Sequence, residues 1–303
     1  MLGSILIKRD DLAGFGQDGR SGVKARKLEG LLAYLSEKGF KSLELPLGNI
    51  TNLAADLAGV ARQFGISLKF LILNDPPLPQ SIREELFRTM DADIRFMGAS
   101  WAMAGLEIAI RKAASLGTRH FVTVPSPSHP TAVLGATAGY IEAISQAKAA
   151  YGVTPRAVYI AAAAGSTVAG FALGEALLRR SGAAPIEIVA VPVVDQPVGL
   201  CARMLARWTA HSFGFGSDLK LNLSVAKDPR NLRYGRFDAA LEDVCRRVEQ
   251  SHNVAIDPIY GGKSWRAMED REATVSDTRP ILFWHCGYTY NWLAYREQLL
   301  DAA

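Results

Sequence analysis

The sequence has few cysteines, no long apolar run and no dense cluster of basic residues. Its three cysteines, Cys201, Cys245 and Cys286, lie far apart and form no CxxC pair, which is typical of a protein of the reducing cytoplasm. Apolar stretches such as residues 70–73 and 157–164 are too short to cross a bilayer. Lys and Arg number 34 against 30 Asp and Glu, and they form no stripe. We therefore expect no nucleic-acid and no membrane partner.

Several familiar catalytic signatures are also missing. The sequence has no HExxH and no GxSxG motif, which disfavours a zinc protease and a serine hydrolase. The segment Gly262-Lys263-Ser264 ends like a phosphate-binding P-loop, but Asp257 stands where that loop needs its first glycine. The five histidines are scattered along the chain, so we predict no metal site.

What the sequence does contain is a regular alternation of apolar runs and helical patterns. Short β-rich runs occupy residues 43–47, 68–73, 94–97, 120–124, 157–162, 186–194 and 281–285. Amphipathic helical spacing occupies residues 27–38, 52–64, 103–116, 134–149, 168–178, 237–249 and 291–300. Largely apolar strands separated by helix-length segments predict an α/β fold with parallel sheets covered on both faces. In such sheets, ligands bind beyond the carboxyl ends of the strands.

A lysine at the entrance to the first helical pattern is the first candidate for chemistry. Lys24 follows Gly22 and precedes Arg26 and Lys27. By pattern alone this is a basic surface cluster. It can also be a lysine that binds a carbonyl cofactor covalently, which requires an amine whose pKa is lowered by desolvation or by a neighbouring cation. Arg26 and Lys27 would supply that charge, and we expect the side chain of Lys27 itself to point elsewhere.

Two loops that follow apolar strands offer hydrogen-bond donors. Thr51 and Asn52 precede a helical pattern and fit helix capping, but they would also serve a substrate carboxylate at the start of that helix. In the second loop, Gly165, Ser166 and Thr167 allow backbone amides to approach an anion. This loop lacks the spacing of a dinucleotide site, which favours a single phosphate. Any tight turn between a strand and a helix has part of this pattern.

Two segments near the carboxyl end are ambiguous by themselves. Residues 257–264 read DPIYGGKS, which is compatible with a plain turn. Residues 283–287 read FWHCG, which is compatible with a buried strand that ends in a glycine turn, and a lone cysteine there is most often packing.

Taken together and in order, these segments resemble the aminocyclopropane-carboxylate deaminase and D-cysteine desulfhydrase family. This family is a branch of the fold-type-II pyridoxal-phosphate (PLP) enzymes, which are related to tryptophan synthase β. The matching segments are residues 7–12, 24–29, 165–167 with 169–170, 257–260 with 262–264, and 285 with 287. The resemblance implies two open, twisted, mostly parallel sheets flanked by helices. It also implies a smaller α/β domain over residues 38–132 and a larger, discontinuous cofactor-binding domain over residues 1–37 and 133–303.

The resemblance also implies pyridoxal 5′-phosphate as cofactor and a role for each matched residue. Lys24 is similar to the lysine that binds PLP covalently and moves protons. Thr51 stands where the family has a serine that faces the substrate, and Asn52 matches an asparagine beside the carboxylate and the cofactor. The remaining implied roles are a phosphate cup at Gly165, Ser166, Thr167 and Val168, substrate-facing tyrosines at Tyr234 and Tyr260, and a place near the pyridine ring for Cys286.

Departures from the family pattern gather around the expected pocket. Val23 stands where the family has an asparagine. Gly261 stands where the deaminases have a glutamate that keeps the pyridine nitrogen protonated. A neutral ring is a weaker electron sink, so we expect elimination or replacement rather than opening of a cyclopropane ring. The cofactor's charges and a nearby cation would lower the pKa of Tyr260, so that it could act as nucleophile or proton carrier.

The sequence therefore predicts a PLP-dependent lyase or deaminase of a small amino acid, which works by α-proton abstraction and β-elimination in the manner of D-cysteine desulfhydrase. We expect a cytoplasmic homodimer. One alternative is a β- or γ-replacement enzyme of a specialised biosynthetic pathway. The other is a catalytically silent descendant that binds an amino acid, which the altered Val23 and Gly261 would suit and the retained Lys24 would not.

Overall fold

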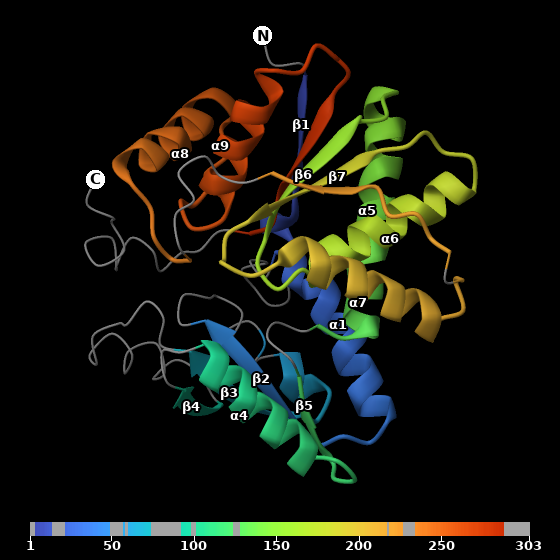
Figure 1. The fold of residues 1–303 in the computed structure, drawn as a ribbon, viewed down its shortest axis with the longest axis vertical. Helices are drawn as coiled ribbons and strands as arrows, with labels where there is room; N and C mark the ends of the chain where they lie inside the picture. The colour runs from blue at the N-terminus through green and yellow to red at the C-terminus, as the bar shows by residue number, and fades with distance from the viewer. Residues whose placement is uncertain are drawn as a thin grey trace.

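Two parallel sheets organise the protein (Figure 1). The computed structural model describes residues 4–13, 22–48, 57, 60–73, 92–97, 101–123, 128–216, 218–226 and 234–287. The larger sheet has five strands in the order β1-β9-β6-β7-β8, and the smaller has four in the order β4-β3-β2-β5. Each pairing in both sheets is parallel. The predicted fold class, with two parallel sheets flanked by helices, is confirmed.

The larger sheet draws its strands from both ends of the sequence. These strands are β1 (Ile5–Arg9), β6 (Ala157–Ala162), β7 (Glu187–Pro192), β8 (Leu223–Val225) and β9 (Ile281–His285). Side chains alternate between its two faces, because successive residues of a strand point in opposite directions. Val158 and Ile160 face α5 (Pro130–Tyr151), α6 (Ser166–Arg180) and α7 (Val198–Ser212). Ala157 and Tyr159 face α8 (Ala239–His252) and α9 (Gly261–Glu272).

The smaller sheet lies between α1 (Val23–Glu37) and α4 (Trp101–Ala114). Its strands are β2 (Ser42–Gly48), β3 (Ser67–Leu73), β4 (Asp93–Met97) and β5 (His120–Val122). Four leucines of α1 are fully buried in the core under one face of this sheet: Leu28, Leu31, Leu32 and Leu35. The first turn of α1 has a different neighbour, since Val23 lies in the core of the larger sheet. Thus α1 belongs to both halves of the structure.

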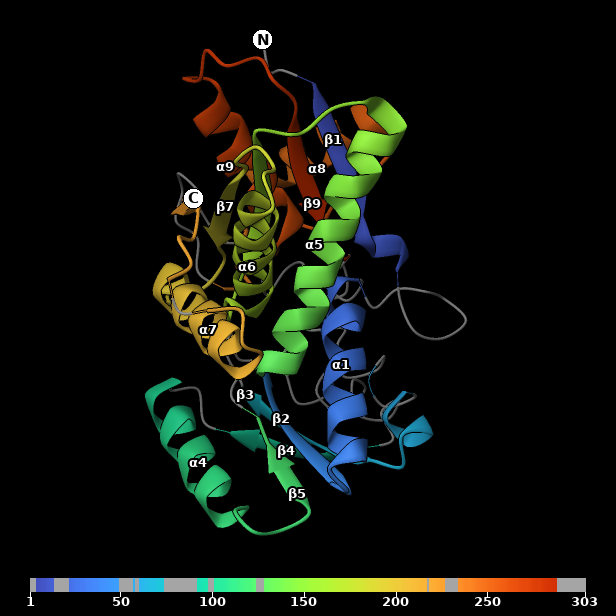
Figure 2. The ribbon, with the colours of Figure 1, turned by 90° about the vertical axis from the view of Figure 1, so that its right-hand side faces the viewer.

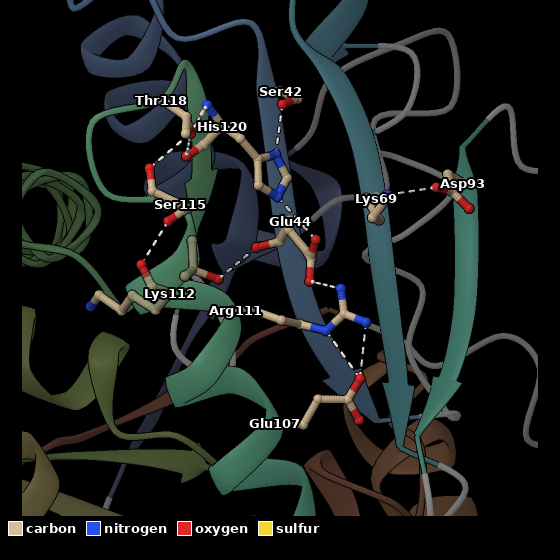
Figure 3. A network of polar contacts seen from close by, with 11 residues as sticks. Ser42, Glu44, Lys69, Asp93, Glu107, Arg111, Lys112, Ser115, Thr118 and His120 are labelled. Atoms are coloured by element: carbon tan, nitrogen blue, oxygen red, sulfur yellow. Dashed lines mark hydrogen bonds and ion pairs between the residues drawn. The ribbon is translucent and has the colours of Figure 1, made fainter.

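A polar network fastens α4 to the other face of the smaller sheet (Figure 3). The carboxylate of Glu44 on β2 is 2% exposed and accepts hydrogen bonds from Arg111 of α4 at 3.0 Å. Its second oxygen lies 3.0 Å from Nε2 of His120 on β5, whose Nδ1 lies 2.6 Å from the Ser42 hydroxyl. A buried carboxylate requires such partners, because desolvation of an unpaired charge is costly.

The observed elements agree with the sequence pattern for most of the described residues. Four elements were not expected: α7, α9 and the short strands β1 and β8. The helix expected over residues 52–64 lies mostly outside the described residues, and the one over 291–300 lies entirely outside them. The domain boundaries after residues 37 and 132 stay a prediction. Among the helices described, none is both long and apolar enough to span a bilayer.

Candidate functional site

The site forms where β1, β9 and β6 end side by side. Arg9 of β1 pairs with His285 of β9, and Trp284 of β9 pairs with Ile160 of β6. Beyond these ends lie a 3-10 turn (Asp10–Leu12), Cys286 and the loop before α6. The helix α1 begins at the same edge, because the Val23 amide donates to the Cys286 carbonyl at 2.9 Å. This is the sheet edge at which the sequence placed a ligand.

Gly22 allows α1 to start this close to β9. Its φ is +63°, and a Cβ at this position would lie 2.1 Å from the Cys286 carbonyl oxygen. Glycine is therefore needed both for the backbone conformation and for the space. The side chain of Val23 is buried in the core of the larger sheet. The valine that replaces the family's asparagine therefore serves packing at this position. The contact with β9 sets the position of Lys24 in the first turn.

The Lys24 amine faces Tyr260, which itself pairs with Tyr234. The Lys24 Nζ lies 5.8 Å from the centroid of the Tyr260 ring. The hydroxyl groups of Tyr260 and Tyr234 are 3.0 Å apart. A tight turn presents Tyr260, because the buried Asp257 carboxylate accepts from the amides of Ile259 and Tyr260 at 2.9 and 2.7 Å. The structure therefore brings together three residues that the sequence only associated by resemblance.

Burial raises the pKa of the Tyr260 phenol well above 10, and the neighbouring Tyr234 adds to this effect. The protein groups around Tyr260 therefore raise its pKa, and a lowering by the cofactor's charges stays a prediction. Desolvation penalises the charged phenolate, and the nearby Asp257 and Cys286 act in the same direction. Tyr260 is thus held in its protonated form, which can donate a proton and cannot serve as a base near neutral pH.

The loop between β6 and α6 places residues 165–168, the anion cup, at the start of a helix. Gly165 precedes the helix with φ +82°, and a Cβ there would lie 3.1 Å from the Ala202 amide nitrogen. The amides of Ser166, Thr167 and Val168 occupy the first turn of α6, where helix geometry leaves N–H groups without intrahelical acceptors. These donors and the helix dipole both favour an anion at this end.

Lys27 points into the same cup and is the functional candidate that the sequence reasoning missed. It is 3% exposed, and its Nζ donates to the Ser166 hydroxyl at 3.2 Å. Burial, and secondarily the charge of Lys24, lowers the pKa of Lys27 to about 7. The expectation that Lys27 points elsewhere is wrong, because residues three apart share one face of a helix. That spacing was the available signal.

A buried ammonium beside an anion cup is a specific observation about ligand chemistry. Among the described residues, no carboxylate forms an ion pair with Lys27. A buried cation is unfavourable without a negative partner, and a phosphate at the start of α6 would supply one. The Lys24 amine lies beside the ring of Tyr260, and its bond to the cofactor's carbonyl stays a prediction. The residues present therefore fit PLP.

Cys286 directly follows β9, and its thiol is close enough to both lysines to feel their charge. Burial, together with the charge of Asp10, raises the pKa of Cys286 to about 12 against the opposing effect of Lys24 and Lys27. A protonated thiol is a weak hydrogen-bond donor, and it lies 3.6 Å from the Trp284 carbonyl. Its place beside the pyridine ring stays a prediction. Thr51 and Asn52 lie outside the described residues.

Gly261 opens α9, directly after Tyr260. A Cβ at this position would lie 2.9 Å from the Cβ of Ile256, which is closer than two such atoms normally approach. Local packing therefore selects glycine here, and a glutamate at position 261 would require Ile256 to move.

Comparison with known proteins agrees with this geometry. The family model described as "Pyridoxal-phosphate dependent enzyme" matches residues 2–287. The chain belongs to this family. It is 29% identical over 290 residues to the 1-aminocyclopropane-1-carboxylate deaminase of Burkholderia cenocepacia, covering 88% of this chain and 81% of the relative. PLP as cofactor and the class of PLP-dependent lyases or deaminases are thereby confirmed.

Two solved structures share the fold of this chain. A crystal structure of "the ACC deaminase homologue" matches 98% of this chain and 88% of its own, with a TM-score of 0.78 and 24% identity. A hydrogen sulfide-producing enzyme of Fusobacterium nucleatum matches 96% of this chain and 92% of its own, with a TM-score of 0.62 and 12% identity. At these identities the likeness shows the fold alone, so the reaction has to be argued from the site.

Proposed function

We propose that this PLP-dependent enzyme removes a protonated leaving group from the β-carbon of a small amino acid, as D-cysteine desulfhydrase does. The observation that carries this proposal is the pairing of Lys24 with a Tyr260 phenol that stays protonated. A reaction of this kind needs one group that accepts a proton at the α-carbon and one that donates a proton at the β-carbon. Lys24 and Tyr260 supply these two groups.

The residues divide the work by position. Bound PLP would supply the electron sink that makes the α-proton acidic. The Lys24 Nζ takes this proton as the α C–H bond breaks. The bond from the β-carbon to the leaving atom then breaks, and that atom takes the proton of the Tyr260 hydroxyl. Addition of water releases a 2-oxo acid and ammonia. Lys27, Ser166 and the first amides of α6 hold the phosphate, and Thr51 and Asn52 would bind the substrate carboxylate.

The absence of an acid at position 261 supports elimination over opening of a cyclopropane ring. Gly261 offers the pyridine nitrogen no proton, and the high pKa of Tyr260 disfavours a phenolate nucleophile that would attack the ring. Both features weaken the chemistry named for the Burkholderia relative. Neither weakens departure of a thiol, which needs a proton donor.

The first experiment identifies the lysine. The protein is incubated with PLP, reduced with borohydride and digested for mass spectrometry. We expect the pyridoxyl label on Lys24, and we expect Lys24→Ala to lose the absorbance band of the lysine-bound cofactor while Lys27→Ala keeps it at higher PLP concentration. A label on Lys27 would contradict the assignment.

The second experiment identifies the reaction. Release of pyruvate, ammonia and sulfide is measured with D-cysteine, L-cysteine, β-chloroalanine and aminocyclopropane carboxylate. We expect turnover of a β-substituted alanine. Faster opening of the cyclopropane ring than elimination from every cysteine or serine derivative would overturn the proposal. A product that retains nitrogen and carries an added thiol would instead establish replacement.

A further inference from the structure

Arg26 stands between the two lysines in the sequence and binds two other elements, the turn after β1 and the helix α5. Its Nε and one terminal nitrogen lie 3.1 to 3.3 Å from the carboxylate of Asp10, which follows β1. Its two terminal nitrogens donate to Glu142 of α5 at 2.8 and 3.0 Å. The Asp10 carboxylate is 1% exposed and also accepts from the Trp284 indole of β9 at 2.9 Å.

Only a guanidinium can make this set of contacts. Its five donors lie in one plane and can serve two carboxylates at once, whereas an ammonium is a compact charge that favours one. Two carboxylates neutralise the Arg26 cation and raise its pKa, so its charge adds little to the site beside it. The contribution of Arg26 to the lysines is thus geometric, because it stops α1 from turning about its own axis.

Two glycines of α5 set how deeply α1 sits. A Cβ at Gly135 would lie 1.9 Å from the Arg26 carbonyl oxygen, and one at Gly139 would lie 2.6 Å from the Arg26 Cδ. On the other side of α5, a Cβ at Gly170 of α6 would lie 2.5 Å from the Cβ of Ala136. Figure 2 shows α5 running between α6 and α1. The phosphate cup and the lysine helix are therefore spaced by one helix at van der Waals contact.

We propose that Arg26 is a positioning residue: held by Asp10 and Glu142 and seated on Gly135 and Gly139, it fixes the rotation and depth of the first turn of α1 and so aims Lys24 at the tyrosines and Lys27 at the phosphate cup. This rests on the proposed function, in which both lysines serve PLP. It goes beyond that function because the hydrogen bonds of Arg26 go to Asp10 and Glu142 and to neither Tyr260 nor Ser166.

The test measures the two amines without the cofactor. Each lysine of the apoprotein is labelled by brief reductive methylation over a range of pH, and the midpoint of labelling is read by mass spectrometry. In Arg26→Lys, α1 can turn and admit water, so we expect the Lys27 midpoint to rise from near 7 by about one unit or more. The PLP dissociation constant should rise about tenfold.

Matched variants separate position from stability. Arg179→Lys changes the same residue type in an ion pair with the buried Glu175, at the far end of α6, and should leave the Lys27 midpoint unchanged. Gly139→Ala alters no charge and should shift the midpoint in the same direction as Arg26→Lys, while Gly105→Ala of α4, where a Cβ meets nothing within 4 Å, should not. The glycine pair keeps the test decisive if Arg26→Lys folds poorly.

The outcomes distinguish this inference from the proposed function. A Lys27 midpoint that stays within about 0.2 units of wild type in both Arg26→Lys and Gly139→Ala overturns the role of Arg26. An equal shift in Arg179→Lys does so too, because the effect would then be general loosening. If PLP instead labels another lysine in the wild type, the proposed function fails while the midpoints still decide the role of Arg26.

Discussion

The buried ammonium of Lys27 costs stability until an anion joins it. Its pKa is lowered to about 7 from its ordinary value of 10.5. Between these two values the unfolded chain binds more protons than the folded one, so the contribution of Lys27 to stability becomes less unfavourable as the pH rises. Below pH 7 its full penalty remains. In the proposed function, a phosphate bound beside Lys27 would offset this loss of stability.

Lys27→Met should therefore stabilise the apoprotein and weaken the holoenzyme. At pH 7 we expect the free energy of unfolding of the apo variant to exceed that of wild type by on the order of 1–4 kcal/mol. The difference should shrink toward pH 10.5, and the PLP dissociation constant should rise. Urea unfolding at pH 7, 8.5 and 10 measures the difference. A variant that is less stable than wild type at pH 7 would contradict the burial of a charged Lys27.

The contribution of Tyr260 to turnover should be largest for substrates whose leaving group must be protonated as it departs. Because its pKa is raised well above 10, the phenol is an acid throughout the working range. Tyr260→Phe should lower turnover of a cysteine derivative at least about a hundredfold, the lower end for general acid catalysis, with PLP affinity unchanged.

The matched comparison for Tyr260→Phe is β-chloroalanine, whose chloride leaves without a proton. Its turnover should fall far less than that of the cysteine derivative. Equal losses for the two substrates would show that Tyr260 positions the substrate and does not protonate the leaving group.

At the residue scale, motifs preserve residue type and order, and they nominated Lys24, Tyr234, Tyr260 and the loop at Gly165. The structure brings Lys24 close to the two tyrosines, while the roles of these residues stay predictions. Whether an amine is buried depends on the elements that pack on it, and α5 and α6 reach Lys27 from more than a hundred residues away. The rise in the pKa of Tyr260 likewise comes from burial, which a sequence motif does not reveal.

At the scale of elements, the buried carboxylate of Glu44 ties α4 to the smaller sheet. Glu44 is 2% exposed and faces Arg111 and His120 (Figure 3). Glu44→Gln would remove the buried carboxylate partner of Arg111 and leave it only the partly exposed Glu107. Breaking a fully buried pair costs about 3–5 kcal/mol, and Arg111 is 21% exposed, so we expect a loss of about 2 kcal/mol in the free energy of unfolding by urea.

The same sheet supplies the control for Glu44→Gln. Asp93→Asn breaks the ion pair between Asp93 and Lys69, in which the Asp93 side chain is 63% exposed and the Lys69 side chain 39%. Exposed pairs contribute about 0–1 kcal/mol, so this variant should be close to wild type. If the two variants lose the same stability, the Glu44 network contributes no more than a surface pair.

The elements that the sequence did not predict are those whose signal is tertiary. The buried face of α7 carries the small residues Ala202, Ala206 and Ala210. Its large apolar residues Leu200, Met204 and Trp208 are exposed, so the apolar pattern does not mark the face that packs inward. α9 begins with Gly261 and Gly262, which read as a turn. Gly262 is required because a Cβ there would lie 2.8 Å from the sulfur of Cys245 on α8. Local propensity contains no information about these contacts.

At the scale of the whole molecule, α1 joins the two sheets. Its first turn carries Lys24 and Lys27 at the edge of the larger sheet, and its leucines fill the core of the smaller one. A ligand that holds the first turn therefore also stabilises the packing of the smaller sheet. The predicted division after residue 37 would place this helix with the larger domain, although four of its leucines lie in the core of the smaller sheet.

Removal of PLP should consequently lower the stability of α1 and the smaller sheet as well as that of the anion cup. A ligand present at a thousand times its dissociation constant stabilises the folded state by about 4 kcal/mol, so the thermal midpoint of the apoprotein should fall by several degrees. Hydrogen exchange should accelerate at the start of α6 and equally in α1 residues 28–35 and in β2. Strands β7 and β8, at the opposite edge of the larger sheet from β1, serve as the internal control. If exchange increased only around Gly165 while α1 and β2 kept their protection, α1 would not couple the cofactor to the smaller sheet.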